Sequence, residues 1–274
     1  MSALLLAGGG AKGAFQAGLL AEFGRQGYWP FTDFYGTSAG ALNAPFAEWG
    51  EIIELNTLWD RPDLEKLVHR KWSKLRSMWR QLRGARGWYD NTPLFWTLCD
   101  TFARYPAIER TWVSLTDLVT GDGKYSLATP ETCYMSATIP GVYAPALDRY
   151  VDGGLRSMAP VSKAVDDGHD EMVLVLCNPT RLGTYAGRDT MHDAARAMEI
   201  MLHEIMLGDL GTTRDKNLLR SSGATKIDGT EYRHIDVQVI SPNEETGKSL
   251  DFSRDHTRRA KVAGVRAARA FLDR

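Results

Sequence analysis

The chain has 274 residues, of which 43% are hydrophobic and 24% are charged, and its formal net charge is -1. This length supports one sizeable core, and the balanced charge excludes the strongly basic surface typical of proteins that bind nucleic acid. Three cysteines that lie far apart, without a C-x-x-C spacing, exclude a disulfide framework and a structural zinc site and predict a cytoplasmic protein; they are Cys99, Cys133 and Cys177.

The N-terminal part of the chain predicts two units in which a strand is followed by a helix. The first unit is an apolar strand, a glycine-rich loop and a helix, at Leu4–Leu6, Gly8–Gly13 and Ala14–Gln26. The second unit is the strand Phe31–Tyr35 and the helix Ala39–Glu48. The apolar N-terminus lacks the basic residues and the length of a secretion signal, so we expect it to form the first buried strand.

Three further apolar runs have the length of buried strands, at Val113–Val119, Met172–Cys177 and Ile235–Ile240. The polar stretch Asn243–Lys248 predicts a loop before a C-terminal helix over about Asp255–Leu272. Because helical patterns separate most of the strands, we expect an α/β fold with three α/β/α layers and a mainly parallel central sheet. No run approaches ~18 consecutive apolar residues, so a transmembrane helix is not expected.

Residues 36–40 form a G-x-S-x-G pentapeptide with Ser38 at its centre, after a predicted strand and before a predicted helix. This is the layout of a nucleophile elbow, a tight turn that presents a serine to a substrate carbonyl. Gly36 and Gly40 carry no side chains that would obstruct the Ser38 hydroxyl. The pentapeptide therefore predicts a serine hydrolase, although an ordinary glycine-bounded turn matches the same pattern.

The loop before the first helix satisfies a G-x-G-x-x-G pattern with Gly8, Gly10 and Gly13. In a dinucleotide-binding protein such a loop holds a pyrophosphate, and Asp33 is spaced to bind the ribose. In a hydrolase, free amide groups at the start of a helix stabilise an oxyanion, and we assign this role to Gly9 and Gly10. Lys12 adds a cation for the helix start or for an anionic head group. A glycine-rich turn without a ligand is the third interpretation.

A serine nucleophile needs a base that accepts its proton. Among the histidines, only His234 and His256 come late enough for the Ser-Asp-His order of α/β-hydrolases, and neither lies in a distinctive motif. Asp152 follows a short predicted strand and precedes Gly153 and Gly154, where a carboxylate can approach another group closely. Asp152 is therefore the candidate base.

Three blocks in this order resemble the patatin-like phospholipase family: GGGAKG at residues 8–13, GTSAG at 36–40 and DGG at 152–154. Residues 136–145 resemble the segment that leads to the family's aspartate. The resemblance implies a patatin-like fold and a Ser-Asp dyad of Ser38 and Asp152, with no metal or organic cofactor. It also implies an oxyanion hole at Gly9 and Gly10, with Lys12 in the place of the family's Arg or Lys.

The segment 64–88 combines leucine and tryptophan at helical spacing with many cations and, from residue 66, no acid; the cations are Lys66, Arg70, Lys71, Lys74, Arg76, Arg80, Arg83 and Arg86. Such a helix suits peripheral contact with an anionic membrane, where each cation contributes about 1 kcal/mol. The alternative is a helix that packs on the core and exposes its basic face to solvent. We expect residues 1–274 to form one domain with a helical, lid-like insertion at about 57–110.

These observations together predict a serine lipid acyl hydrolase that cleaves fatty acyl esters of phospholipids or other lipids, with no nucleic-acid partner. Two alternatives remain open. One is a carboxylesterase or thioesterase for small soluble esters, and the other is a non-catalytic lipid-binding protein that keeps the fold. An enzyme that uses a nicotinamide cofactor is a third, more distant interpretation.

Overall fold

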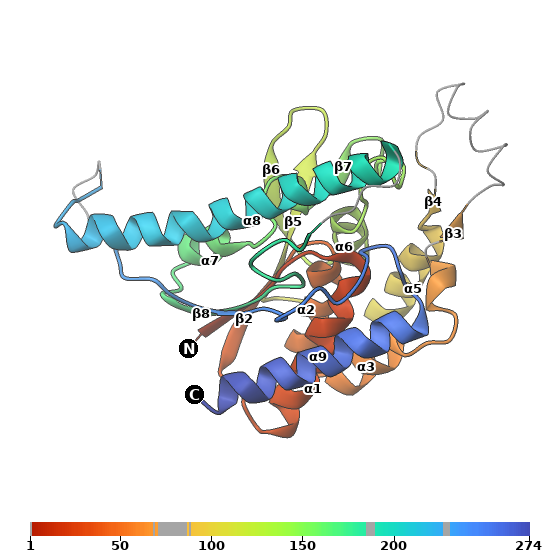
Figure 1. The fold of residues 1–274 in the computed structure, drawn as a ribbon, viewed down its shortest axis with the longest axis horizontal. Coiled ribbons are helices and arrows are strands. Elements are labelled where there is room, and N and C mark those ends of the chain that lie inside the picture. Colours follow the sequence, from red (N-terminus) through yellow and green to blue (C-terminus); the bar gives the residue numbers. More distant parts are fainter. Residues whose placement is uncertain (1, 68, 71–86, 88, 185–189, 227–230) are drawn as a thin grey trace.

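A computed structural model describes residues 2–67, 69–70, 87, 89–184, 190–226 and 231–274 (Figure 1). Its centre is a seven-stranded sheet in the order β6-β5-β2-β1-β8-β9, with β7 also paired to β5. The strands of this sheet are β1 Ser2–Leu6, β2 Phe31–Gly36, β5 Thr111–Asp117, β6 Gly123–Leu127, β7 Tyr150–Asp152, β8 Glu171–Val175 and β9 Asp236–Ile240. Neighbouring strands from β5 through β2, β1 and β8 to β9 are parallel, whereas β6 and β7 are antiparallel to β5.

Helices cover both faces of this sheet. They are α1 Ala14–Arg25, α2 Ala39–Trp49, α3 Ile52–Trp59, α5 Thr92–Phe102, α6 Pro130–Ser136, α7 Val161–Asp166, α8 Thr190–Ser221 and α9 Arg254–Leu272, with short 3₁₀ turns η1 Gly10–Gly13, η2 Leu64–Leu67 and η3 Gly153–Leu155. Alternate residues of a strand point to opposite faces. Leu4 and Leu6 accordingly pack in the core with α1, α3 and α9, while Leu5 packs with residues of α7 and α8. Figure 1 shows α9 beside α1, and α8 on the far side of the sheet.

The three-layer fold with a mainly parallel sheet, expected from the sequence, is confirmed. The third expected strand is shifted, because β5 ends at Asp117 rather than at Val119. The Asp117 carboxylate accepts hydrogen bonds from the amides of Val119 and Thr120 and so closes a turn there. The long helix α8 was not expected. Its sequence is polar on average and contains Gly208 and Gly211, which weaken the helical pattern.

The basic segment lies largely outside the described residues, namely at 68, 71–86 and 88. Its described ends differ from the expected continuous helix. Leu64–Leu67 forms one 3₁₀ turn, and β3 His69–Arg70 pairs antiparallel with β4 Tyr89–Asp90. This pairing places Arg70 beside Tyr89, 19 positions later in the chain. Among the helices of the described ranges, none combines the length and the apolar composition needed to cross a lipid bilayer.

The pairing along β5 places the candidate residues. Strand β6 pairs with residues 112–116 on one edge of β5. On the other edge, β2 pairs up to Val113, opposite Gly36, and β7 pairs from Leu115, opposite Asp152. Strand β7 thus continues the line of β2 just beyond the point where the chain turns into α2. The end of β2 and the end of β7 therefore meet at one place beside β5.

Candidate active site

Ser38 lies on a tight turn between β2 and α2. Its φ of 54° is in the left-handed region that is uncommon for residues other than glycine. The glycines on either side are required by close packing: a Cβ at Gly40 would lie 1.9 Å from the carbonyl oxygen of Leu6, and one at Gly36 would lie 2.5 Å from the oxygen of Gly40. The turn has the geometry that the pentapeptide predicted.

Ser38 and Asp152 are in direct contact. The Ser38 hydroxyl donates a hydrogen bond of 2.6 Å to Asp152 Oδ2, and the Gly154 amide donates one of 2.8 Å to Asp152 Oδ1. Both side chains are buried, with exposed fractions of 5% for Ser38 and 7% for Asp152. A Cβ at Gly153 would lie 2.1 Å from Ser114 Oγ, so the DGG turn approaches β5 as closely as its glycines permit.

The surroundings of Asp152 raise its pKa to about 6. Burial is the main cause, since it disfavours the charged carboxylate. The hydrogen bonds from Ser38 and from the Gly154 amide act in the opposite direction and lower the pKa. A carboxylate with a pKa near the working pH is suited to take a proton from a hydroxyl group and return it later.

Ser136 contacts the turn from the end of α6, although no motif in the sequence predicts a role for this side chain. Its hydroxyl, at the end of α6, accepts a hydrogen bond of 3.0 Å from the Ser38 amide. The next residue back, Thr37, donates its amide to Leu6 O at 3.1 Å. Because the main chain at Ser38 is strained, these two bonds hold a conformation that the residue would not adopt alone.

The glycine loop lies beside Ser38. A Cβ at Gly8 would lie 3.2 Å from Ser38 Cβ, which places the two turns at the same edge of the sheet. Gly10 has φ of 58°, and the Ala11 amide donates to Ser249 O at 2.8 Å. The amides of Gly9 and Gly10 donate to no acceptor among the described residues. These two amides are therefore available for another acceptor.

Lys12 is buried and paired with other protein groups. Its ammonium donates a hydrogen bond of 2.6 Å to Asn178 Oδ1 and lies 3.6 Å from Glu199 of α8. The lysine thus links the helix start to the rest of the fold. Its role toward an anionic head group stays a prediction, and these pairings do not favour it. Gly13, also predicted from the motif, allows close packing, because a Cβ there would lie 2.7 Å from Ala39 Cβ.

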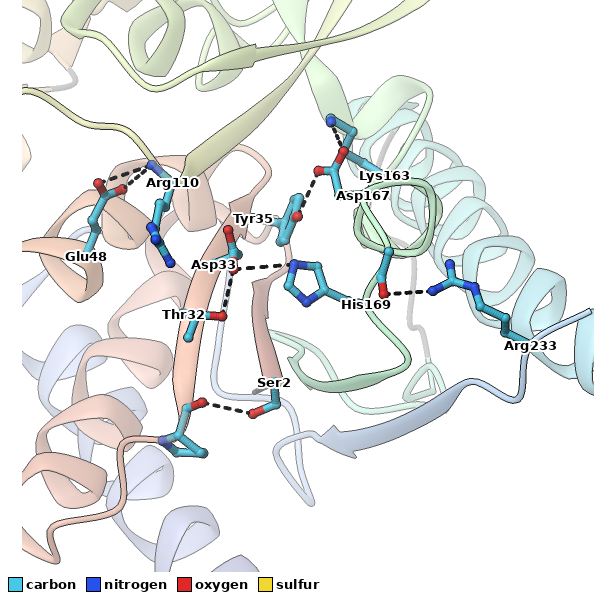
Figure 2. Close-up of polar contacts among 12 residues, drawn as sticks. Ser2, Thr32, Asp33, Tyr35, Glu48, Arg110, Lys163, Asp167, His169 and Arg233 are labelled. Atoms are coloured by element: carbon cyan, nitrogen blue, oxygen red, sulfur yellow. Dashed lines mark hydrogen bonds and ion pairs between the residues drawn. The ribbon is translucent and has the colours of Figure 1, made fainter.

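The histidines considered as bases lie elsewhere. His234 is exposed, and His256 is buried on α9, where its Nδ1 contacts Asp251 O. Within the described ranges, neither Ser38 nor Asp152 forms a hydrogen bond with a histidine. Asp33, considered for ribose binding, accepts a hydrogen bond from Thr32 and pairs with His169 at 3.5 Å (Figure 2). It is the third of the six residues of β2, in the half of the strand farther from Ser38.

An apolar cavity of about 110 Å³ is lined by both Ser38 and Gly10. About 10–15 Å³ is enough for one water molecule, so the cavity can hold a larger group. Its walls come from α2, α3 and α5 and from the loops before β7 and α9, and they include Leu42, Leu55, Leu94, Leu98, Ile139 and Phe252.

Most of the polar side chains in the cavity wall bond to other protein groups. Asn43 Nδ2 donates to Gly13 O and to Gln16 Oε1, and the Trp59 indole donates to Asn43 Oδ1. The hydroxyls of Thr97 and Thr101 donate to carbonyl oxygens of their own helix. The wall therefore presents mainly hydrocarbon to whatever enters, next to the Ser38 hydroxyl.

Asp152→Asn is expected to stabilise the folded protein by about 1–3 kcal/mol at pH 8, where the buried carboxylate is charged. The pKa of Asp152 rises from 3.8 to about 6 on folding, so the neutral acid stabilises the fold below about pH 4, and this contribution is lost as the pH rises through 6. Urea unfolding of both proteins at pH 4 and pH 8 measures this. A stabilisation that is as large at pH 4 as at pH 8 would contradict the assignment.

A model of the family described as "Patatin-like phospholipase" matches residues 4–165, which contain the glycine loop, the elbow and Asp152. The uncharacterized protein YjjU of Escherichia coli (strain K12) is 27% identical over 201 residues, which are 66% of this chain and 53% of YjjU. The crystal structure of VipD from Legionella pneumophila matches 99% of this chain and 66% of that chain, with a TM-score of 0.49 and 14% identity. This chain thus spans about half the length of YjjU. Because the family model covers more than half of the residues, the chain belongs to the patatin-like phospholipase family.

Proposed function

We propose that this protein is a serine lipid acyl hydrolase, which cleaves fatty acyl esters of phospholipids or related lipids through an acyl-Ser38 intermediate. The observation that carries the proposal is the 2.6 Å hydrogen bond between Ser38 Oγ and Asp152 Oδ2 at the wall of an apolar cavity. Membership of the patatin-like phospholipase family supports the same class of reaction.

In the proposed mechanism, Asp152 takes the Ser38 proton as Oγ attacks the ester carbonyl, and a tetrahedral intermediate forms. The free amides of Gly9 and Gly10 donate to its oxyanion. Protonated Asp152 then gives the proton to the leaving alcohol, and the C–O bond breaks. In the second half, Asp152 accepts a proton from water as the water oxygen attacks the acyl carbonyl. The bond between the acyl carbon and Ser38 Oγ then breaks, Asp152 returns the proton to Oγ, and the fatty acid leaves.

The cavity favours a lipid over a small soluble ester. Most of its polar wall groups already have protein partners, so a polar acyl group would find few partners there, whereas hydrocarbon gains about 25 cal/mol for each Å² removed from water. Because Ser38 and Gly10 line the same cavity, an acyl chain inside it would have its carbonyl beside the nucleophile and the free amides.

Peripheral contact with an anionic membrane is a further part of the proposal. The cations of residues 66–88 support this membrane contact, and the segment contains no acidic residue. On the helices that flank this segment in the chain, two large apolar side chains are exposed: Ile53 on α3 by 86% and Trp96 on α5 by 61%. Both helices also line the cavity. We therefore propose that residues 57–110 act as a lid-like insertion at the lipid surface.

Ser38→Ala and Asp152→Asn are each expected to lower hydrolysis of a phospholipid ester by at least about 10³-fold, because each removes one half of the dyad. His234→Ala and His256→Ala are the matched controls and are expected to keep the rate if they fold. Mass spectrometry of the released fatty acids measures all four variants. Full activity in Ser38→Ala would exclude the mechanism, and loss of activity in a folded histidine variant would exclude the dyad.

Leu94→Trp is expected to lower kcat/KM for a long-chain ester by about tenfold or more while leaving a short-chain ester nearly unchanged, because the indole fills part of the acyl cavity. Phe95→Trp adds the same side chain to the same helix, outside the cavity lining, and serves as the control. A series of p-nitrophenyl esters of increasing chain length measures the effect. Equal loss on all esters would point to general damage rather than to an acyl site.

The double variant Arg76→Glu, Arg80→Glu is expected to weaken binding to anionic vesicles by about tenfold or more, since each cation contributes about 1 kcal/mol. Arg214→Glu with Arg220→Glu, at exposed positions of α8, makes the same charge change elsewhere. Co-sedimentation with phosphatidylcholine vesicles, with and without phosphatidylglycerol, measures binding. Equal weakening by both double variants would show that net charge, and not this segment, determines binding.

A further inference from the structure

The long helix α8 carries a carboxylate that the proposed mechanism does not use. Asp209 Oδ2 accepts a hydrogen bond of 2.8 Å from the Ala159 amide. Burial raises the pKa of Asp209 to about 6, while hydrogen bonds from the amides of Ala159 and Met158 and from the side chain of Ser157 lower it. A partly buried carboxylate is costly unless its hydrogen bonds compensate for the lost water. Here all these bonds come from one short segment.

That segment, residues 157–159, is here called the strap, and its carbonyl groups contact two parts of the active site. The Ser157 carbonyl accepts a hydrogen bond of 3.1 Å from Thr37 Oγ1, and Thr37 directly precedes the nucleophile. The Met158 carbonyl accepts one of 3.2 Å from the Gly8 amide, at the start of the glycine loop. The strap therefore joins the elbow to the loop whose amides are free.

The side chain of Met158 adds a third contact. A Cβ at Gly8 would lie 2.6 Å from Met158 Sδ, and one at Gly154 would lie 3.2 Å from the same atom. Met158 thus packs against both the glycine loop and the turn that holds Asp152. In this way one segment touches the regions of the nucleophile, the base and the oxyanion amides.

We propose that Asp209 is a positioning residue for the Ser38 site, whose carboxylate holds the strap and thereby fixes the separation of the elbow, the glycine loop and the Asp152 turn. The inference rests on the proposed hydrolase function. Asparagine has nearly the same size as aspartate, but it has one acceptor oxygen and no charge. In Asp209→Asn the strap is held less firmly, and small displacements of reacting groups slow catalysis strongly.

Another titratable group lies near Asp209. Tyr125 of β6 is close enough to Asp209, and to Asp166 of α7, for both carboxylates to act on it electrostatically. Burial raises the pKa of Tyr125, so the phenol stays neutral between pH 5 and 8. Over this range, Asp209 changes from mostly protonated to charged. At pH 5 the wild-type side chain therefore resembles the asparagine of the variant.

The experiment compares wild type, Asp209→Asn and Asp215→Asn, an exposed carboxylate of the same helix, from pH 5 to pH 8. We measure kcat and KM for ester hydrolysis and the rate at which a fluorophosphonate reagent labels Ser38. Asp209→Asn is expected to be about tenfold slower than wild type at pH 8, through kcat, and only about twofold slower at pH 5. Asp215→Asn is expected to match wild type throughout, and Asp209→Glu, which keeps the charge, is expected to recover part of the rate at pH 8.

A deficit that is the same at every pH, or no deficit at pH 8, would overturn the inference, because the proposed role belongs to the charged carboxylate, which wild type largely loses at pH 5. If Asp209→Asn does not fold, Asp209→Glu decides. If Asp209→Glu folds but hydrolyses the ester about tenfold more slowly than wild type at pH 8, the result argues against a role of the charge. If the fluorophosphonate labels Ser38 of the wild type and the deficit of Asp209→Asn is the same at every pH, this inference alone is overturned. If Ser38 of the wild type is not labelled and is not needed for ester hydrolysis, the proposed function is overturned as well.

Discussion

The hydrogen bond between Ser38 and Asp152 joins residues that are 114 positions apart in the chain. Strand β5 brings these two residues together. On one edge of β5, β2 ends opposite Val113 and β7 ends opposite Leu115. The chain leaves the sheet at Ser38 just where β7 arrives, so the two side chains meet without a long loop. Parallel pairing of β2 and antiparallel pairing of β7 are both needed, since they bring the two strand ends to the same point.

Two features of this site are unfavourable by themselves. Ser38 has a positive φ, and Asp152 is a buried carboxylate whose pKa is raised to about 6. Hydrogen bonds from the surroundings hold both: the Ser38 amide bonds to Ser136, and the Gly154 amide bonds to Asp152. Backbone strain and buried ionisable groups of this kind are typical of functional sites, where they do not serve the stability of the fold.

The sequence predicted the features that depend on local signals. Apolar runs located the parallel strands, and the glycines at 36 and 40 located the elbow, because only residues without a side chain fit against Leu6 and against the turn itself. Features that depend on distant contacts were missed. Helix α8 has a polar, glycine-interrupted sequence, and the roles of Ser136 and Asp209 depend on partners 98 and 50 positions away. No local pattern distinguishes Asp209 from other aspartates, and the resemblance of residues 136–145 to a family segment does not indicate what the Ser136 side chain contacts.

Ser38 stands at the boundary between polar and apolar surroundings. On one side are Asp152, the DGG turn and the free amides, and on the other side is a mainly apolar cavity, most of whose polar wall groups bond to other protein groups. An ester has the same division, because a polar carbonyl lies next to a hydrocarbon chain. Helices α3 and α5 form part of the cavity wall and are also the nearest helices on either side of residues 64–88 in the chain. If that segment binds a lipid surface as proposed, the two helices beside it in the chain are the ones that line the cavity, so the proposed membrane contact and the proposed acyl site adjoin in the chain.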